Sequence, residues 1–140
     1  MDVAEELKLR DRVLKYIVYK KRTENEIRTK FKAIIDENTL DDIIEYFKDA
    51  GYIDDKMYVE RSINEIKALK NLSIKEIKYK LYQKGINMSL LDDYIQENYE
   101  ELQEYEKKSA QNIKMKKQNT MTEDEVKIYL LKKGYKGENI

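Results

Sequence analysis

The feature that most constrains this chain is a short capped helix whose pattern occurs three times. One occurrence, from Ser73 to Ile86, reads SIKEIKYKLYQKGI. The Ser73 hydroxyl can accept the N–H three residues on, and Glu76 can reach back to the N–H of Ser73, which makes a capping box. An isoleucine and a leucine four positions apart form an apolar stripe. Gly85 can adopt the left-handed conformation that ends a helix. The stretch therefore contains a helix with both of its boundaries.

The same pattern begins at Thr23 and at Thr122, so the three cap positions are 50 and 49 residues apart. In each occurrence a Glu follows the cap by three residues, a β-branched residue by four, and Phe or Leu by eight. A helix this short has little apolar surface of its own to bury. The repetition therefore predicts an array of similar units that share a core.

The composition agrees with an all-helical protein. The 140 residues include no Pro and only 4 Gly, with 41% hydrophobic and 40% charged residues, a mixture that favours helices when its apolar residues recur at helical spacing. We predict a tandem array of three three-helix repeats, elongated and curved, with boundaries at 1–53, 54–98 and 99–140. The last repeat is predicted to be incomplete at its third helix.

The apolar periodicity also predicts the individual helices. In the first repeat they span 5–19 and about 24–34, with Val18 on the inner face, and a third helix that Thr39 caps and Gly51 ends. The second repeat has a helix from about 55, one from 73 to 84, and a third that Ser89 caps. The third repeat has a long polar helix over 97–117 and a helix over 122–133. We expect the C-terminus from Gly137 onward to be frayed.

Several functions are disfavoured by what the chain lacks. With no Cys and no His, it has no disulfide, no thiolate metal site, and neither the commonest metal ligand nor the commonest general base. The aspartate pairs 41–42, 54–55 and 92–93 could be metal or acid–base sites, but each lies where a helix begins and can cap it. We predict no catalytic site, no metal and no cofactor. No apolar run is long enough to cross a membrane. We therefore expect a cytoplasmic protein without membrane contact, and we expect a monomer.

The charges lie in blocks although the formal net charge is zero. Residues 8–32 hold ten basic and three acidic residues, whereas 36–60 hold two basic and nine acidic ones. The alternation continues with seven basic and two acidic residues in 61–84, seven acidic in 89–106, and five Lys in 107–117. Such blocks suit a partner reached by electrostatic steering, and solvated helix faces explain them equally.

Basic residues at equivalent positions of the three repeats are the best candidates for a partner surface. One set lies five residues after each cap, and others recur at seven and eleven. Lys20 to Arg22 follow the first helix. Cations at a helix C-terminus interact favourably with the helix dipole, and these three could instead contact phosphate or an acidic partner. The candidates are Lys20, Lys21, Arg22, Arg28, Lys30, Lys78, Lys80, Lys84, Lys127, Lys132 and Lys133. Tyr52 and Tyr58 could stack on bases, but their position beside apolar residues favours core packing.

Taken in order, these motifs resemble the RecX family of recombination regulators. The turn Gly51-Tyr52-Ile53-Asp54-Asp55, then Tyr58, then Lys84-Gly85-Ile86 match the family pattern of a middle repeat. Leu130-Leu131-Lys132-Lys133-Gly134-Tyr135 match its C-terminal feature. The resemblance covers about Leu9 to Ile140.

The resemblance implies three tandem three-helix repeats and a non-enzymatic negative regulator of RecA. Such proteins bind in the groove of the RecA filament on single-stranded DNA and limit its growth or promote its disassembly. They thereby lower ATPase, strand-exchange and SOS coprotease activity.

Two alternatives remain open. One is a DNA-binding module of helix-turn-helix type, with weak direct DNA binding by the basic helices. The natural recognition helices, which Thr39 and Ser89 are predicted to cap, are acidic, which disfavours their entry into a groove. The other is an interaction scaffold for an unrelated partner.

Overall fold

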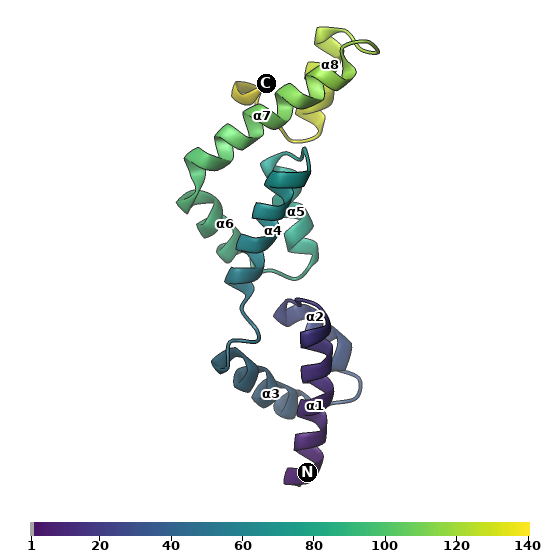
Figure 1. Ribbon diagram of the computed structural model, residues 1–140, viewed down its shortest axis with the longest axis vertical. Helices are drawn as coiled ribbons and strands as arrows, with labels where there is room; N and C mark the ends of the chain where they lie inside the picture. The colour runs from purple at the N-terminus through teal and green to yellow at the C-terminus, as the bar shows by residue number, and fades with distance from the viewer. Residues whose placement is uncertain (1) are drawn as a thin grey trace. The chain divides into compact units, whose positions relative to one another are not determined.

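The computed structural model describes residues 2–140 and is entirely helical over that range (Figure 1). Residues 2–140 form eight α-helices and one 3₁₀ helix, and they contain no strand. The helices are α1 (Val3–Tyr19), α2 (Glu24–Phe31), α3 (Glu37–Asp49), α4 (Asp55–Leu69), α5 (Ile74–Gln83), α6 (Met88–Glu97), α7 (Tyr99–Lys117), α8 (Glu123–Lys132) and the 3₁₀ helix η1 (Gly137–Asn139).

Contacts divide the chain into two compact parts. The first comprises the chain up to Tyr58 together with Lys84–Ile86, and the second comprises Val59–Gln83 and Asn87–Ile140. The short segment 84–86 therefore packs with residues that lie far from it in the sequence.

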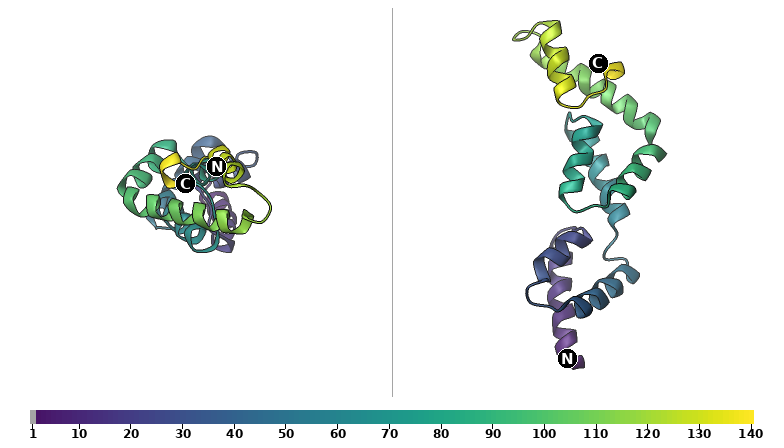
Figure 2. Two further views of the ribbon diagram at one scale, coloured as in Figure 1. Left: turned by 90° about the horizontal axis from the view of Figure 1, so that it is seen from above. Right: turned by 180° about the vertical axis from the view of Figure 1, so that it is seen from behind.

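The first part is built by α1, α2 and α3, which lie against one another in Figures 1 and 2. Each helix contributes one apolar face, because its buried residues are spaced by three or four positions. The core consists of Val13, Ile17, Ile27, Phe31, Ile35, Leu40, Ile43, Ile44, Phe47 and Ile53. Tyr16 packs edge-on against Phe31 at the rim, with ring centroids 5.5 Å apart. Val18, which was predicted to widen this face, is instead 62% exposed.

The second part contains α5 to α8, η1 and most of α4. Its helices bury Val59, Ile63, Ile66, Ile77, Leu81, Leu91 and Leu102, and a further cluster joins Ala110, Val126, Leu130 and Tyr135. This last cluster lies between α7 and α8, which run side by side in Figure 2.

The predicted capping boxes are present at all three positions. The hydroxyls of Thr23, Ser73 and Thr122 accept the backbone N–H three residues on, at 3.0 to 3.2 Å, and Glu26, Glu76 and Glu125 return the bond at 3.0 to 3.1 Å.

The caps of α3 and α6 were predicted wrongly. Asp36 caps α3 by accepting the N–H of Thr39 at 3.1 Å, and Asn87 caps α6 by accepting the N–H of Ser89 at 2.8 Å. Thr39 and Ser89 therefore lie inside the first turn. Asp and Asn are as good N-caps as Thr and Ser. In the segment before each helix, the first residue of these four types was therefore the better prediction of the cap.

The C-terminus is held rather than frayed. Residues 137–139 form η1, and Asn139 is buried, with its side-chain amide donating to Gln103 at 2.8 Å and to Glu106 at 2.5 Å. The sequence gave no sign of this because the two acceptors lie more than thirty residues earlier, on α7.

Candidate partner-binding surface and the cap joints

The hydroxyl that caps α2 makes a second, long-range hydrogen bond. Thr23 is fully buried; its Oγ1 accepts the N–H of Glu26 and donates to the backbone carbonyl of Lys84 at 2.7 Å. The first N–H of α2, that of Glu24, donates to the Asp55 carboxylate at 3.0 Å. One of the backbone N–H groups that a helix start leaves unpaired is thus satisfied by a residue far along the chain.

Ser73 makes the same contacts at the start of α5. It is also fully buried, accepts the N–H of Glu76, and donates to the carbonyl of Lys133 at 2.7 Å. The N–H of Ile74 donates to the Glu106 carboxylate at 2.9 Å. We call the contacts around Thr23 the first cap joint and those around Ser73 the second cap joint.

A glycine completes each cap joint. Gly85 and Gly134 follow the two acceptor carbonyls and have φ of +85° and +98°, which a residue with a Cβ adopts only with strain. A Cβ on Gly85 would lie 2.2 Å from that of Asn25, and one on Gly134 would lie 2.9 Å from that of Lys75. Asn25 and Lys75 each lie two residues after their cap, so the same close approach occurs in both joints.

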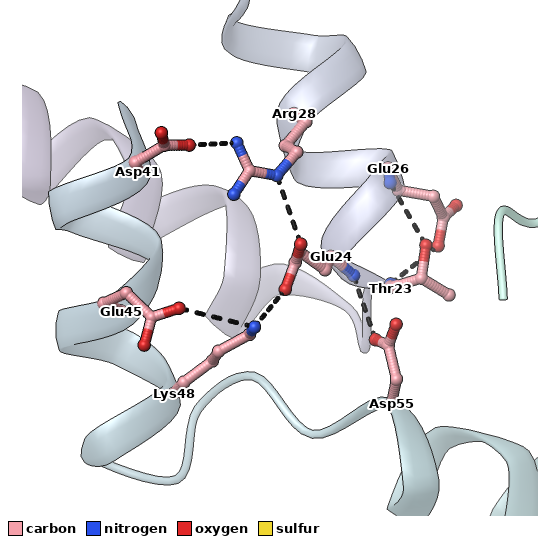
Figure 3. A network of polar contacts seen from close by, with 8 residues as sticks. All are labelled: Thr23, Glu24, Glu26, Arg28, Asp41, Glu45, Lys48 and Asp55. Carbon is pink, nitrogen blue, oxygen red and sulfur yellow. Dashed lines mark hydrogen bonds and ion pairs between the residues drawn. The ribbon is translucent and has the colours of Figure 1, made fainter. Parts of the chain in front are cut away.

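A polar network surrounds the first cap joint (Figure 3). The Arg28 guanidinium donates to Asp41 at 2.5 Å and to Glu24 at 3.1 Å, and the Lys48 ammonium lies 2.5 Å from Glu24. Burial opposes the ionisation of Glu24, but the hydrogen bonds from Lys48 and Arg28 outweigh it and lower the pKa of its carboxyl.

Asp55, in the same network, is affected in the opposite direction. Its burial raises the pKa of the carboxyl, although the N–H of Glu24 favours the charged form. The network therefore holds two carboxylates, of which one is stabilised in its charged form and the other is not.

Two of the three basic residues five positions after the caps are engaged within the fold. Arg28 pairs with Asp41, and Lys78 pairs with Asp92 at 2.5 Å. Both pairs tie a capped helix to the helix that follows it. Asp41 and Asp92 therefore lie inside α3 and α6 as ion-pair partners instead of capping them, whereas Asp54 does cap α4, accepting the N–H of Met57 at 3.0 Å.

Two clusters bring predicted basic residues together with a tyrosine ring. In the first part, Arg22 lies 4.1 Å and Lys30 lies 5.7 Å from the centre of the Tyr16 ring. In the second part, Lys117 and Lys133 lie 4.6 Å and 5.6 Å from the centre of the Tyr129 ring. We call these the two basic–tyrosine clusters. Cations over aromatic faces are attracted by the ring quadrupole, so each cluster gathers two positive charges at one tyrosine ring.

The remaining candidates vary in exposure. Lys20, Lys21, Lys80, Lys127 and Lys132 are exposed. Lys84 is half-buried, and its ammonium lies 3.9 Å from Glu26.

Three members of the clusters were not predicted from the sequence: Tyr16, Lys117 and Tyr129. Lys117 belongs to the basic block 107–117, and that block was the signal that could have identified it.

Core packing was favoured for Tyr52 and Tyr58, but neither is fully buried. Tyr52 is 47% exposed and meets Phe47 edge-on at 5.8 Å, while Tyr58 is half-buried. Tyr52 therefore packs at the rim of the first core.

Within residues 2–140, no group of three or more acidic residues could hold a metal ion. Over the same range, no helix has the length and apolarity that a membrane span requires.

Comparison with curated proteins finds regulatory RecX proteins. The chain is 33% identical to "Regulatory protein RecX" of Finegoldia magna, covering 90% of this chain and 58% of that protein. It is 33% identical to the Staphylococcus epidermidis protein, with 91% and 49% covered, and 32% identical to the Clostridium acetobutylicum protein, with 99% and 70% covered. The chain thus spans about half to two thirds of the length of the relatives it matches first. No family profile matches the sequence.

Solved structures show the same fold. A crystal structure of regulatory protein RecX superimposes with a TM-score of 0.78 at 27% identity, covering 96% of this chain and 70% of the other. The crystal structure of RecX from Lactobacillus salivarius gives a TM-score of 0.82 at 22% identity, covering 98% and 93%. On the sequence match that spans nearly the whole chain and most of the Clostridium acetobutylicum relative, the chain belongs to the RecX family.

Proposed function

We propose that the protein is a negative regulator of RecA recombinase that binds the RecA filament on single-stranded DNA. It would bind in the filament groove and limit growth or promote disassembly, and so lower ATPase, strand-exchange and SOS coprotease activity. Family membership is the observation that carries this proposal. The regulator acts by binding, needs no cofactor, and works as a monomer in the cytoplasm, where it meets RecA.

The repeated cap joint supports a modular architecture for this role. The same set of contacts recurs at Thr23 and Ser73, as expected if three-helix repeats stack in tandem. We infer an elongated, curved array, since a small constant rotation between stacked repeats generates curvature. A curved array suits the groove of a helical filament.

We propose that the contact surface consists of the exposed basic residues and the two basic–tyrosine clusters. The residues are Lys20, Lys21, Arg22, Lys30, Lys80, Lys117, Lys127, Lys132 and Lys133. Arg28, Lys78 and Lys84 contribute less, because each faces a carboxylate of its own fold. Complementary charge of this kind mainly sets the association rate and the register of a complex.

The second candidate is a DNA-binding module. It is favoured by the basic–tyrosine clusters, because cations and aromatic rings together bind single strands. It is disfavoured by α3 and α6, whose exposed faces carry aspartates and glutamates that phosphate would repel.

One paired measurement separates the two candidates. RecA ATPase on single-stranded DNA is followed with substoichiometric amounts of the protein, and binding of the protein to bare single- and double-stranded DNA is measured at moderate salt. Strong inhibition with weak DNA binding is the expected result. Tight binding to duplex DNA without an effect on RecA would favour the DNA-binding module, and absence of both would overturn the proposed regulation.

A further inference from the structure

The first and second cap joints have equivalent residues around the start of the capped helix. Glu24 and Ile74 each follow the cap by one position, and the N–H of each donates to a carboxylate. Five positions after the caps, the cations of Arg28 and Lys78 each lie 2.5 Å from an aspartate of the next helix. The two joints can therefore be compared residue by residue.

In the first joint a carboxylate lies between two cations (Figure 3). The side chain of Glu24 accepts from the Arg28 guanidinium at 3.1 Å and lies 2.5 Å from the Lys48 ammonium. Burial opposes the ionisation of this carboxyl, but the hydrogen bonds from the two cations lower its pKa. The place between the cations therefore suits a negative charge.

The second joint has an apolar residue, Ile74, where the first has Glu24. Within residues 2–140, the Lys78 ammonium pairs with a single carboxylate, that of Asp92, whereas Arg28 holds two. An ammonium group has three N–H donors. Lys78 can therefore bind a second carboxylate that its own fold does not supply.

A second ammonium group lies close by. Tyr99 is the counterpart of Lys48, since each follows the aspartate of the recurring ion pair by seven residues. The Lys136 ammonium lies 5.0 Å from the centre of the Tyr99 ring, and within residues 2–140 the side chain of Lys136 forms no ion pair. The second joint thus has two cations without the carboxylate that lies between them in the first.

These groups surround an open hollow of about 460 Å³ within the second part of the chain. This volume is in the range of ligand-binding pockets, and the apolar residues of the wall can pack against the methylene groups of a side chain. The residues that matter for its chemistry are Ile74, Lys75, Lys78, Tyr99, Leu131 and Lys136.

We propose that this hollow, which we call the carboxylate hollow, binds an aspartate or glutamate side chain of the partner protein. The incoming carboxylate takes the place that Glu24 has in the first joint, between the ammonium groups of Lys78 and Lys136, with the exposed Lys75 beside it. A carboxylate is favoured over a phosphate because the first joint holds a carboxylate at this place. The proposal rests on the proposed function, since the partner is the one proposed there.

The carboxylate of Glu106 also lines the hollow, and its charge is already engaged. Its oxygens accept the backbone N–H groups of Ile74 and Lys136 and the amide of Asn139. In the first joint, Asp55 accepts the N–H of Glu24 in the same way. Two neighbouring carboxylates are thus compatible with this site.

The first test places a carboxylate in the hollow. Ile74→Glu introduces one at the position of Glu24, and its pKa, measured by NMR during a pH titration, should fall below the ordinary glutamate value of about 4.3. Adding Lys78→Met should raise that pKa again, because it removes an ion-pair partner. A pKa at or above the ordinary value in the single variant would overturn the proposal, whatever the effect on RecA.

The second test asks whether the partner uses the hollow. With a carboxylate of its own in place, the Ile74→Glu variant should need about tenfold more protein for half-inhibition of RecA ATPase on single-stranded DNA, as expected for loss of one charge-assisted contact. Ile74→Gln has nearly the same shape without the charge and should stay within about twofold of the parent. Leu69→Glu, which adds the same charge at an exposed position of α4, is the matched control.

The cations are tested separately, without a change at Ile74. Lys75 and Lys136 are exposed, so Lys75→Met/Lys136→Met should keep the fold and raise the concentration for half-inhibition about fivefold. Lys107→Met/Lys108→Met removes the same charge from α7 and should leave inhibition unchanged. Equal inhibition by the two double variants would overturn the proposal even if Ile74→Glu did not fold.

The outcomes also separate this proposal from the proposed function. If the parent inhibits RecA and Ile74→Glu inhibits equally well, only the present proposal is wrong. If the parent does not inhibit RecA, both are wrong. Binding of each variant to bare single-stranded DNA is measured alongside, and a tenfold loss there for Ile74→Glu would make a phosphate the occupant, which overturns the proposal as well.

Discussion

Thr23 and Ser73 show how one buried hydroxyl can bind the start of its own helix and a distant backbone carbonyl. Each accepts the N–H that begins its own helix and donates to a carbonyl about sixty residues away. A buried hydroxyl without partners would cost free energy, so full satisfaction is what makes complete burial tolerable. Thr122 has only the local half of these contacts, and the comparison of the three residues therefore isolates the long-range bond.

Replacing Thr23 by valine should destabilise the protein more than the same change at Thr122. Thr122→Val removes an exposed cap and should cost about 1 kcal/mol of unfolding free energy. Thr23→Val also leaves the buried carbonyl of Lys84 unpaired, for a total of about 2–4 kcal/mol. Urea unfolding followed by circular dichroism measures both values, and equal costs would show that the bond to Lys84 contributes nothing.

Gly85 and Gly51 form a second matched pair. Both have φ near +80°, but no atom lies within 4 Å of a Cβ built on Gly51. Gly51→Ala should therefore cost only the conformational strain of about 1–2 kcal/mol. Gly85→Ala should cost about 1–3 kcal/mol more, because Asn25 must move. Adding Asn25→Gly should recover part of that difference, and strict additivity in the unfolding measurements would argue against the close contact.

At the scale of the helix, the sequence predicted what depends on local pattern. The three capping boxes and the left-handed glycines follow from residues within one turn of each helix end, and they were placed correctly at Ser73, Gly85 and their equivalents. The caps of α3 and α6 were placed on Thr39 and Ser89, because equal spacing from the first cap was trusted over the earlier Asp36 and Asn87. Equal spacing between repeats therefore predicts an N-cap less well than the first Ser, Thr, Asp or Asn before the helix does.

Contacts between helices could not be predicted from the sequence. Arg28 and Lys78 were proposed as binding residues because they recur, and the structure pairs each with an aspartate of the next helix. At these two positions the recurrence coincides with a recurring ion pair, since a repeat that is copied also copies its internal contacts. The basic–tyrosine clusters were missed for the opposite reason, since their members lie on different helices at unrelated spacings.

The network that links α2 to α3 should make stability depend on pH through Glu24. Because the pKa of Glu24 is lowered in the folded state, its charged form favours folding above the ordinary glutamate pKa of about 4, and this contribution is lost as the pH falls through the folded value. The cost of Glu24→Gln should therefore be larger at pH 7 than at pH 3. Glu45→Gln is the control, as Glu45 is an exposed member of the network, and urea unfolding at both pH values gives the comparison. A cost that does not change with pH would refute the role of the charge.

At the scale of the whole molecule, the distribution of charge matters more than the net charge. The net charge is zero, yet basic residues lie exposed at the end of α1 and around α8. If these surfaces contact the RecA filament, their effect should be electrostatic, additive over separate patches and weakened by salt.

Reversing charge at two patches should weaken inhibition of RecA. The variant Lys20→Glu/Lys21→Glu/Lys132→Glu/Lys133→Glu should raise the concentration needed for half-inhibition of the ATPase about tenfold, as expected for several exposed contacts of modest strength. The control reverses Lys8 and Lys15 on α1 together with Lys107 and Lys108 on α7. Equal inhibition by both variants and the parent protein would remove these patches from the binding surface, provided that circular dichroism shows unchanged helicity.

The Thr23 hydroxyl at the start of α2 also binds the backbone just after α5, and the Ser73 hydroxyl at the start of α5 binds the backbone just after α8. We therefore expect the unfolding of one of these helices to affect the others. Loosening the turn at Gly134 strips Ser73 of its acceptor and frees the opening turn of α5, which in turn releases Lys84 from Thr23. Disorder would thus spread backwards from the C-terminal helices toward the N-terminal ones. The amides at the beginnings of α2 and α5 should then exchange with solvent in one concerted event.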